Sequence, residues 1–239
     1  MTTQLHLTPR LQKVANWVPQ GSKLCDVGTD HAYLPAHLLL KGWIPSAIAS
    51  DIRPGPLERA ARTRSKYGLE NQLDLRLCPG LEAVAPHEVE TVSICGMGGE
   101  MISGILEKAP WTQTKTVLLL QPMRSQPELR RWLWEHGYCI EAEEIVREEQ
   151  RWYTVMRVVG GQMEQPFSHA EALAGRPKDW VSNPQREGYL TYLLEKVQKQ
   201  RRGVEQSSKR ADDERRSLLA QTEAELTHWL DRLKIGGPL

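Results

Sequence analysis

The sequence predicts an α/β protein with a seven-stranded sheet, one strand of which is antiparallel, followed by an α-helical coiled-coil hairpin. Three observations support this. Short apolar runs alternate with helical patterns from residue 8 to about residue 160. Two strand-like segments near the end of that region are joined by only four residues, and apolar seams with heptad spacing follow Glu187. Strands that alternate with helices indicate a parallel sheet covered on both faces.

The first element is predicted to be a helix that begins at Thr8. Threonine is a good N-cap, and Pro9 suits the first helical position. An apolar stripe at i, i+3, i+4 and i+7 follows, made of Leu11, Val14, Ala15 and Val18. Pro19 and Gly21 then end the helix.

Five strands are predicted next, with helices after four of them. The strands are expected at Lys23–Val27, Ala47–Asp51, Leu73–Leu77, Thr91–Cys95 and Thr116–Gln121. The helices are expected at Ala32–Lys41, Pro54–Tyr67, Glu100–Glu107 and Gln126–His136. The stretch from Gly80 to Glu90 has room only for a short helix.

The sixth and seventh strands are predicted to form a hairpin. Tyr138–Arg147 and Trp152–Val159 are separated only by residues 148–151. A connection this short cannot make a crossover between parallel strands, so the pair must be antiparallel. Five βα units closed by a hairpin therefore predict one reversed strand.

A second domain is expected after Gly160-Gly161, which gives domains at residues 1–162 and 163–239. A connecting stretch follows, which contains Pro166, Gly175, Pro177 and Pro184. Two seams follow, Leu190, Leu193, Val197, Gln200 and Val204, then Leu219, Thr222, Leu226, Trp229 and Leu233. They predict two paired helices, with the turn at Ser207-Ser208 or Asp212-Asp213. Because basic and acidic residues both crowd this arm, it is either a solvated coiled-coil face or an arm that grips RNA.

The composition of the chain excludes several classes of protein. With 31 Lys+Arg against 30 Asp+Glu in 239 residues, the net charge is +1, which excludes a generally basic nucleic-acid coat. The longest clean apolar run, residues 117–120, is too short to cross a membrane, and the first seven residues lack the cationic start and apolar core of a signal peptide. Four widely spaced cysteines with no C-x-x-C argue against a zinc site and against a disulfide framework. We expect a cytoplasmic protein with no metal, no membrane contact and no obligate protein partner.

The loop after the first strand is the principal candidate site. In open α/β sheets, ligands bind beyond the carboxyl ends of the strands, near the first of them. Gly28 allows a tight turn and a close approach of a ligand. The loop has only one glycine of the G-x-G-x-x-G pattern, which disfavours a dinucleotide. Because Asp26 and Asp30 would repel phosphates, a phosphate-free cofactor with positive charge is favoured.

Further candidates follow the later strands, at the same predicted edge of the sheet. Asp51 ends the second strand, where a carboxylate can bind a ribose diol, although it could instead cap the helix that begins near Pro54. The residues after the third strand, 78–81, form a plausible adenine-facing loop. The run Gly96-Met97-Gly98-Gly99 allows a flat ligand to approach the backbone, or is simply a flexible connection. Gln121 closes the fifth strand.

Asp30 is the candidate for chemistry, because it could point across the cofactor toward a substrate. The alternative is a helix N-cap, a role for which Thr29 competes. His31 is expected to be a local hydrogen-bond partner.

Three motifs together carry a family resemblance. Residues 24–35 (LCDVGTDHAYLP), 94–99 (ICGMGG) and 119–122 (LLQP) resemble the bacterial tRNA (adenine(22)-N1)-methyltransferase family, TrmK. The resemblance runs from Leu11 through the hairpin, and the helical arm also matches that family. It implies a class I, Rossmann-like S-adenosylmethionine-dependent domain and a coiled-coil domain that helps to hold tRNA.

The resemblance and the motifs together give a set of expected site residues. Asp30 would be catalytic. The cofactor would contact Asp26, Gly28, Asp51, Ile52, Gly80, Leu81, Gly96 and Met97. The tRNA substrate would contact Arg10, Lys13, His31, Tyr33, Gly98, Gly99 and Gln121. One departure is Pro79, where relatives usually carry Asp or Asn, so its side chain cannot bind the adenine amine.

The expected reaction is methyl transfer from S-adenosyl-L-methionine to N1 of adenine 22 in the D-loop of tRNA. N1 lies on the Watson–Crick edge, so the base must be unpaired and turned out of its stack. Three alternatives stay open: a nicotinamide-dependent oxidoreductase, for which the first loop lacks the glycines, a non-catalytic RNA-binding module, and a methyltransferase of small molecules.

Overall fold

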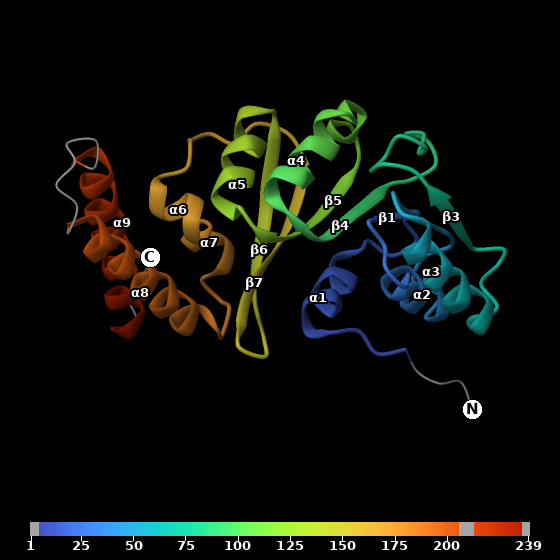
Figure 1. The fold of residues 1–239 in the computed structure, drawn as a ribbon, viewed down its shortest axis with the longest axis horizontal. Helices are drawn as coiled ribbons and strands as arrows, with labels where there is room; N and C mark the ends of the chain where they lie inside the picture. The colour runs from blue at the N-terminus through green and yellow to red at the C-terminus, as the bar shows by residue number, and fades with distance from the viewer. Residues whose placement is uncertain (1–4, 206–212, 236–239) are drawn as a thin grey trace. The chain divides into compact units, whose positions relative to one another are not determined.

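The computed structural model describes residues 5–205 and 213–235. The chain divides into two compact units, Met1–Glu164 and Gln165–Leu239. The first unit contains the sheet, and the second is helical (Figure 1).

The first unit is built on one seven-stranded sheet, as predicted. Its strands are β1 (Leu24–Val27), β2 (Ala47–Asp51), β3 (Leu73–Leu77), β4 (Thr91–Gly98), β5 (Val117–Arg124), β6 (Tyr138–Glu148) and β7 (Arg151–Gly160). They lie in the order β3-β2-β1-β4-β5-β7-β6. Strands β1 to β5 pair in parallel, whereas β7 is antiparallel to both of its neighbours. The predicted single reversed strand is confirmed.

Helices cover this sheet so fully that every residue of β1 and β2 is buried. They are α1 (Pro9–Trp17), α2 (Tyr33–Leu40), α3 (Pro54–Tyr67), α4 (Gly99–Glu107) and α5 (Gln126–Glu135), with a 3₁₀ turn, η1 (Pro110–Gln113). Proline occupies the first turn of α1, α3 and α5, where its missing N–H costs nothing. Gly68 ends α3 in the left-handed conformation.

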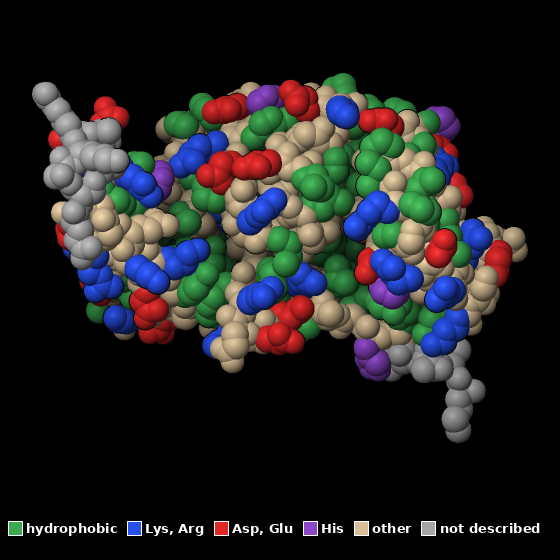
Figure 2. Space-filling view, in the orientation of Figure 1, with side chains coloured by type: hydrophobic (Ala, Val, Ile, Leu, Met, Phe, Trp, Pro, Cys, Tyr) green, Lys and Arg blue, Asp and Glu red, His purple; other side chains and the backbone are tan. Residues whose placement is uncertain are grey.

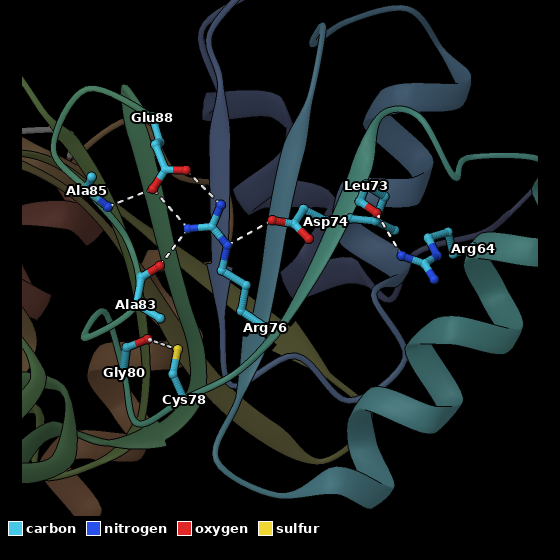
Figure 3. Close-up of polar contacts among 9 residues, drawn as sticks. All are labelled: Arg64, Leu73, Asp74, Arg76, Cys78, Gly80, Ala83, Ala85 and Glu88. Atoms are coloured by element: carbon cyan, nitrogen blue, oxygen red, sulfur yellow. Dashed lines mark hydrogen bonds and ion pairs between the residues drawn. The ribbon is translucent and has the colours of Figure 1, made fainter.

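The stretch between β3 and β4, which the sequence predicts to have room only for a short helix, contains turns and no helix. Arg76 on β3 holds it in place (Figure 3). Its Nη1 and Nη2 donate to the Glu88 carboxylate at 2.9 and 2.7 Å, and its Nε donates to Asp74 at 2.8 Å. Glu88 also accepts from the Ala85 backbone N–H at 2.7 Å. The carboxylate therefore takes a backbone donor that a helix would have used, and its hydrogen bond from Arg76 lowers the pKa of Glu88 to about 2.

Two strands, β4 and β5, extend three residues further than predicted, whereas β6 and β7 differ from their predicted bounds by only one residue at an end. β4 continues through Gly98 and β5 through Arg124, and the two stay paired as far as Gly98 opposite Arg124. The pairing is irregular between Cys95 and Met97, which marks a bulge. Bulges re-aim side chains at strand ends, and this one lies in the glycine-rich run.

The second unit has its own core. It contains α6 (His169–Ala174), α7 (Pro177–Trp180), α8 (Arg186–Glu205) and α9 (Asp213–Lys234). The connecting stretch predicted to be irregular thus contains two short helices, and Ser168 and Glu171 form a capping box at the first of them. The rings of Trp180 and Trp229 meet edge to face at 6.1 Å.

The predicted seams largely match the contact between α8 and α9, which pack against each other. Buried positions of the seams are Leu190, Leu193, Val197, Val204, Leu219, Thr222, Leu226 and Trp229. Gln200 is exposed. The predicted turn residues Ser207, Ser208 and Asp212 lie outside the described residues, and Asp213 begins α9. None of the described helices combines the length and apolar sequence needed to cross a membrane.

Candidate functional site

A hollow of about 380 Å³ opens beyond the carboxyl ends of β1, β4 and β5. We call it the first-strand hollow. The predicted site residues that line it are Arg10, Asp26, Gly28, Asp30, His31, Tyr33, Gly96 and Gln121. These residues come from α1, the β1–α2 connection and the ends of two other strands, so the fold brings together residues more than a hundred positions apart.

Asp26 is the buried acid of this hollow. It lies on β1 and is 8% exposed. Ser93 on the neighbouring strand β4 donates its hydroxyl to Asp26 Oδ1 at 2.7 Å. Burial raises the pKa of Asp26 to about 6, although hydrogen bonds from Ser93 and Thr29 oppose that rise. The hollow therefore contains a carboxylate that a cationic ligand would stabilise in its charged form.

Gly28 is required by its backbone and by its neighbour. Its φ is +72°, and a Cβ placed on it would lie 1.9 Å from Cε of Met97. A side chain at position 28 therefore conflicts both with the left-handed backbone and with the space that Met97 fills. Because Met97 is unbranched and adaptable, the tight turn is backed by a movable apolar wall.

The glycines of the run 96–99 have different roles. Gly96 has a φ of +76°, and a Cβ there would meet nothing within 4 Å, so its backbone is open to a ligand. A Cβ on Gly98 would lie 3.0 Å from Nε of Arg124, and one on Gly99 would lie 2.3 Å from the Ser125 carbonyl oxygen. The last two glycines thus make room for the chain itself at the junction of β4 with α4.

Gln121 on β5 holds the glycine-rich run 96–99 in place. Its side chain is fully buried. Its Oε1 accepts from the Gly96 backbone N–H at 3.1 Å, and its Nε2 donates to the Pro122 carbonyl at 3.1 Å. Both ends of the amide are engaged by the chain, so the side chain fixes the position of Gly96.

Asp30 is exposed and held by side chains, and it does not cap a helix. The turn into α2 is instead held by Thr29, whose Oγ1 accepts from the Ala32 backbone N–H at 3.1 Å. Arg59 on α3 donates its Nε to Asp30 Oδ1 at 2.7 Å, and its Nη2 contacts the same oxygen. His31 Nε2 lies 3.5 Å from Asp30 Oδ2. The N-cap of α2 is Ala32, which has no side-chain cap, so neither Asp30 nor Thr29 fills that role. Thr29 closes the turn just before the helix.

His31 also stacks on Tyr33, with ring centroids 4.8 Å apart and an interplanar angle of 15°. Both rings line the first-strand hollow. The pair forms a flat aromatic surface beside Asp30.

Asp51 at the end of β2 is buried and only half engaged. Its Oδ1 accepts from the Arg53 backbone N–H at 2.8 Å, which orders the approach to α3. Among the described residues, no hydrogen bond reaches Oδ2. The alternative role of Asp51 as a helix cap is wrong, because Arg53 is the N-cap of α3 and has no side-chain cap. Asp51 Oδ1 orders the turn before the helix, and Oδ2 remains available. The next residue, Ile52, is 65% exposed.

A second hollow, of about 280 Å³, contains two of the other predicted cofactor residues, whereas Asp51 and Ile52 line neither hollow. It is lined by Gly80 and Leu81 and by Met101 and Ile105 of α4. Pro79 also lines it, so the wall there is mainly apolar. We call it the Gly80 hollow. Met97 lines neither hollow, although it contacts Gly28.

The two basic residues predicted on α1 are engaged by the β6–β7 hairpin. The Arg10 guanidinium lies 5.1 Å from the centre of the Tyr153 ring and 3.6 Å from Glu148. Lys13 Nζ forms an ion pair with Glu144 at 3.0 Å and lies outside both hollows. Lys13 therefore holds α1 to the sheet.

Sequence reasoning missed Arg59 and Ser93. Two signals could have found them. Arg59, Arg62 and Lys66 recur at helical spacing on one face of α3, and Ser93 is a polar residue in the middle of a strand that is otherwise apolar. A buried hydroxyl in such a strand needs a partner, and Asp26 on the adjacent strand supplies it.

Comparison with known proteins agrees with this geometry. A family model described as "Methyltransferase domain" matches residues 7–156. The tRNA (adenine(22)-N(1))-methyltransferase of Bacillus subtilis (strain 168) is 31% identical over 97% of this chain and 96% of its own. The crystal structure of B. subtilis TrmK, an M1A22 tRNA methyltransferase, superposes with a TM-score of 0.84 at 30% identity, covering 95% of this chain and 99% of that one.

Two similar structures contain ligands. A Streptococcus pneumoniae structure in complex with S-adenosyl-L-methionine is 33% identical, with a TM-score of 0.77 and coverage of 94% and 100%. M. capricolum TrmK in complex with S-adenosyl-homocysteine is 26% identical, with a TM-score of 0.78 and coverage of 94% and 98%. The shared fold, the near-complete coverage and the identity to the B. subtilis enzyme show that this chain belongs to the tRNA (adenine(22)-N1)-methyltransferase family.

Proposed function

We propose that the protein transfers a methyl group from S-adenosyl-L-methionine to N1 of adenine 22 in tRNA. One observation carries the proposal beyond family membership. The first-strand hollow places a buried carboxylate and a glycine turn beside an exposed aspartate, Asp30, that is held by a cation. This arrangement provides one place for a cationic cofactor and one acid directed to a second substrate.

The residues present fit the cofactor. Gly28 makes the tight turn at the hollow, and the backbone of Gly96, where a Cβ would meet nothing within 4 Å, is open to a ligand. Asp26 can pair with the positive end of the methionine part, and the unengaged Oδ2 of Asp51 can accept hydrogen bonds from a ribose diol. When bound, S-adenosyl-L-methionine supplies a methyl group that its sulfonium already activates.

The adenine ring of the cofactor is assigned to the Gly80 hollow. Gly80, Leu81 and Ile105 give it apolar walls, and the exposed Ile52 directly follows β2. Pro79 offers no side-chain acceptor, so a contact to the adenine amine must come from the backbone. The Arg76–Glu88 clamp keeps this loop in place.

Asp30 is assigned to the acceptor adenine. N1 of adenine carries a lone pair and needs no prior deprotonation. As N1 gains the methyl group, positive charge spreads toward the exocyclic amine, and the Asp30 carboxylate stabilises that charge or accepts the amine proton. Arg59 and His31 hold the carboxylate in position, and Tyr33 offers a ring face to the base.

The domain division and the location of the protein follow from this function. We infer that residues 1–162 form the methyltransferase domain and residues 163–239 a helical domain that helps to hold tRNA. The division of contacts after Glu164 supports this boundary. Four free cysteines agree with work in the reducing cytoplasm, where tRNA is found.

The test is methylation of an unmodified tRNA transcript with labelled S-adenosyl-L-methionine, followed by mapping of the methylated base. We expect 1-methyladenine at position 22 and no label on a transcript with guanine 22. Asp30→Ala should reduce turnover by at least a hundredfold while cofactor affinity changes less than twofold, because the partners of the Asp30 carboxylate are Arg59 and His31, neither of which is assigned to the cofactor. Label at another position would refute the assignment, and equal loss of binding and turnover would make Asp30 a loop anchor.

A further inference from the structure

A second opening lies beside the first-strand hollow, along α3. Its volume is about 470 Å³. Arg59, Arg62 and Lys66 line it from the helix, and His31 and Tyr33 line both it and the first-strand hollow. We call it the α3 cleft. The stacked pair of rings is therefore the wall that the two openings share.

The α3 cleft is positively charged. Its three α3 cations are spaced i, i+3 and i+7, which places them on one face of the helix. Arg59 is neutralised by Asp30. Arg62 and Lys66 are exposed, and neither forms an ion pair with a carboxylate of the described residues. Figure 2 shows basic side chains gathered over α3 on this face.

The walls of the α3 cleft include aromatic rings and an N-terminal segment held by a hydrogen bond. Tyr33 is 43% exposed, and Tyr67 lines the other end, where Lys66 Nζ lies 5.1 Å from its ring centre. On the facing side the N-terminal segment is tied down, because the buried His37 donates its Nδ1–H to the Leu5 carbonyl at 2.8 Å. The opening is thus bounded by ordered elements.

We propose that the α3 cleft binds the RNA strand next to the methylated adenine, with Arg62 and Lys66 on its phosphates. Grooves that take single-stranded RNA combine cations along the backbone with aromatic faces for bases, and this cleft has both. An acidic peptide would use the cations but not the ring wall that leads into the first-strand hollow. The inference rests on the proposed function only in assigning that hollow to the adenine.

The test compares tRNA binding by the full chain and by the double variant R62Q/K66Q. Fluorescence anisotropy of a labelled, unmodified tRNA is measured from 50 to 200 mM salt without cofactor. Each phosphate contact contributes about 0.7 to 0.9 to the slope of log affinity against log salt. We expect the variant to lose about 1.5 from that slope and to bind about tenfold more weakly at the lower salt.

The matched control removes two exposed lysines from the opposite edge of the sheet. Lys23 precedes β1 and Lys115 precedes β5, so K23Q/K115Q makes the same change in charge at the amino ends of the strands. We expect its slope to match that of the unaltered protein. Circular dichroism and cofactor affinity should be unchanged in both variants, since none of the four side chains is buried.

Equal slopes for R62Q/K66Q and the unaltered protein would overturn the proposal, and so would equal losses in both double variants. Equal slopes for R62Q/K66Q and the unaltered protein would favour an acidic protein as the partner of Arg62 and Lys66. Because the binding assay needs no methyl transfer, its outcome is separate from that of the proposed function. Failure to methylate adenine 22, together with a slope lost only in R62Q/K66Q, would refute the reaction and leave RNA binding by the α3 cleft standing.

Discussion

At the scale of single residues, Asp26 links the site to the stability of the fold. Its carboxyl group is buried, and burial raises its pKa from 3.8 to about 6. The folded protein therefore holds this proton more tightly than the unfolded chain does. The raised pKa of Asp26 therefore stabilises the folded protein fully below about pH 4. This contribution to the free energy of unfolding is lost as the pH rises through about 6.

We therefore expect Asp26→Asn to be more stable than the unaltered protein at pH 8, by up to about 3 kcal/mol, and equally stable near pH 4. The amide oxygen can still accept from Ser93, so packing is kept. Urea unfolding of both proteins between pH 4 and 8, without cofactor, measures the difference. A difference that does not change with pH would show that burial does not penalise the charged acid.

Arg59 gives a second prediction at this scale. It is the only described residue outside the β1–α2 connection that donates to Asp30, so its loss should misplace the carboxylate. We expect Arg59→Gln to lower kcat for tRNA methylation by about tenfold with little change in cofactor affinity. Arg59→Lys, which keeps one charged donor, should recover part of kcat. If KM for tRNA rises while kcat stays the same, Arg59 binds RNA and does not position Asp30.

At the scale of elements, a buried ion pair joins α5 to β6. Arg130 Nε and Nη2 donate to the two oxygens of Glu143 at 2.8 and 2.9 Å, and neither side chain is more than 1% exposed. The pair lies far along the chain from the loop of Asp26 and Asp30. It fixes the helix against the hairpin that completes the sheet.

Removing one partner leaves a charge buried without compensation. We expect Glu143→Leu to lower the free energy of unfolding by about 3 to 5 kcal/mol. The double variant R130M/E143L should lose less, because it leaves no unpaired charge. Denaturant unfolding of both variants at one pH checks this. A double variant less stable than Glu143→Leu would mean that Arg130 contributes more through its other contacts than through Glu143.

Strands and helices were predictable where the pattern is local. The runs Ala47–Asp51 and Leu73–Leu77 and the helix Pro54–Tyr67 have the predicted bounds, because alternation, proline and glycine define their ends. The conformation between Gly80 and Glu90 could not be predicted in detail, since a carboxylate twelve residues from Arg76 decides it. Such a long-range contact leaves no periodic trace in the sequence.

The candidate site, like the fold, could be predicted only where local patterns or topology determine it. The edge of the sheet that carries it follows from topology, and eight of the predicted residues do line one hollow. Gly98 and Gly99 have the right type but serve the packing of Arg124 and Ser125. Lys13 is held by Glu144 across the sheet. Which side of a glycine is crowded depends on distant chain segments, so spacing alone could not assign these roles.

At the scale of the whole molecule, the two units are joined by residues 161–168, which form neither helix nor strand. Glu164 is exposed there, whereas Glu149 lies in a tight two-residue turn. Proteases prefer exposed and irregular segments. We expect limited digestion with a glutamate-specific protease to cut first after Glu164, giving fragments 1–164 and 165–239 by mass spectrometry. First cuts within α8 or α9 would contradict the proposed domain boundary.

The reversal of β7 has a consequence for how such an enzyme can diversify. Because β7 runs against β5, the tip of the β6–β7 hairpin lies at the edge where β5 ends, and Arg10 links that tip to the first-strand hollow through Glu148 and Tyr153. A parallel strand would have sent this turn to the other edge. Lengthening the turn at Glu149-Gln150 would cost little in chain entropy. The longer loop would lie beside the opening of the first-strand hollow. Different RNA shapes could therefore come to be accepted through changes in this loop, without any change in the buried core.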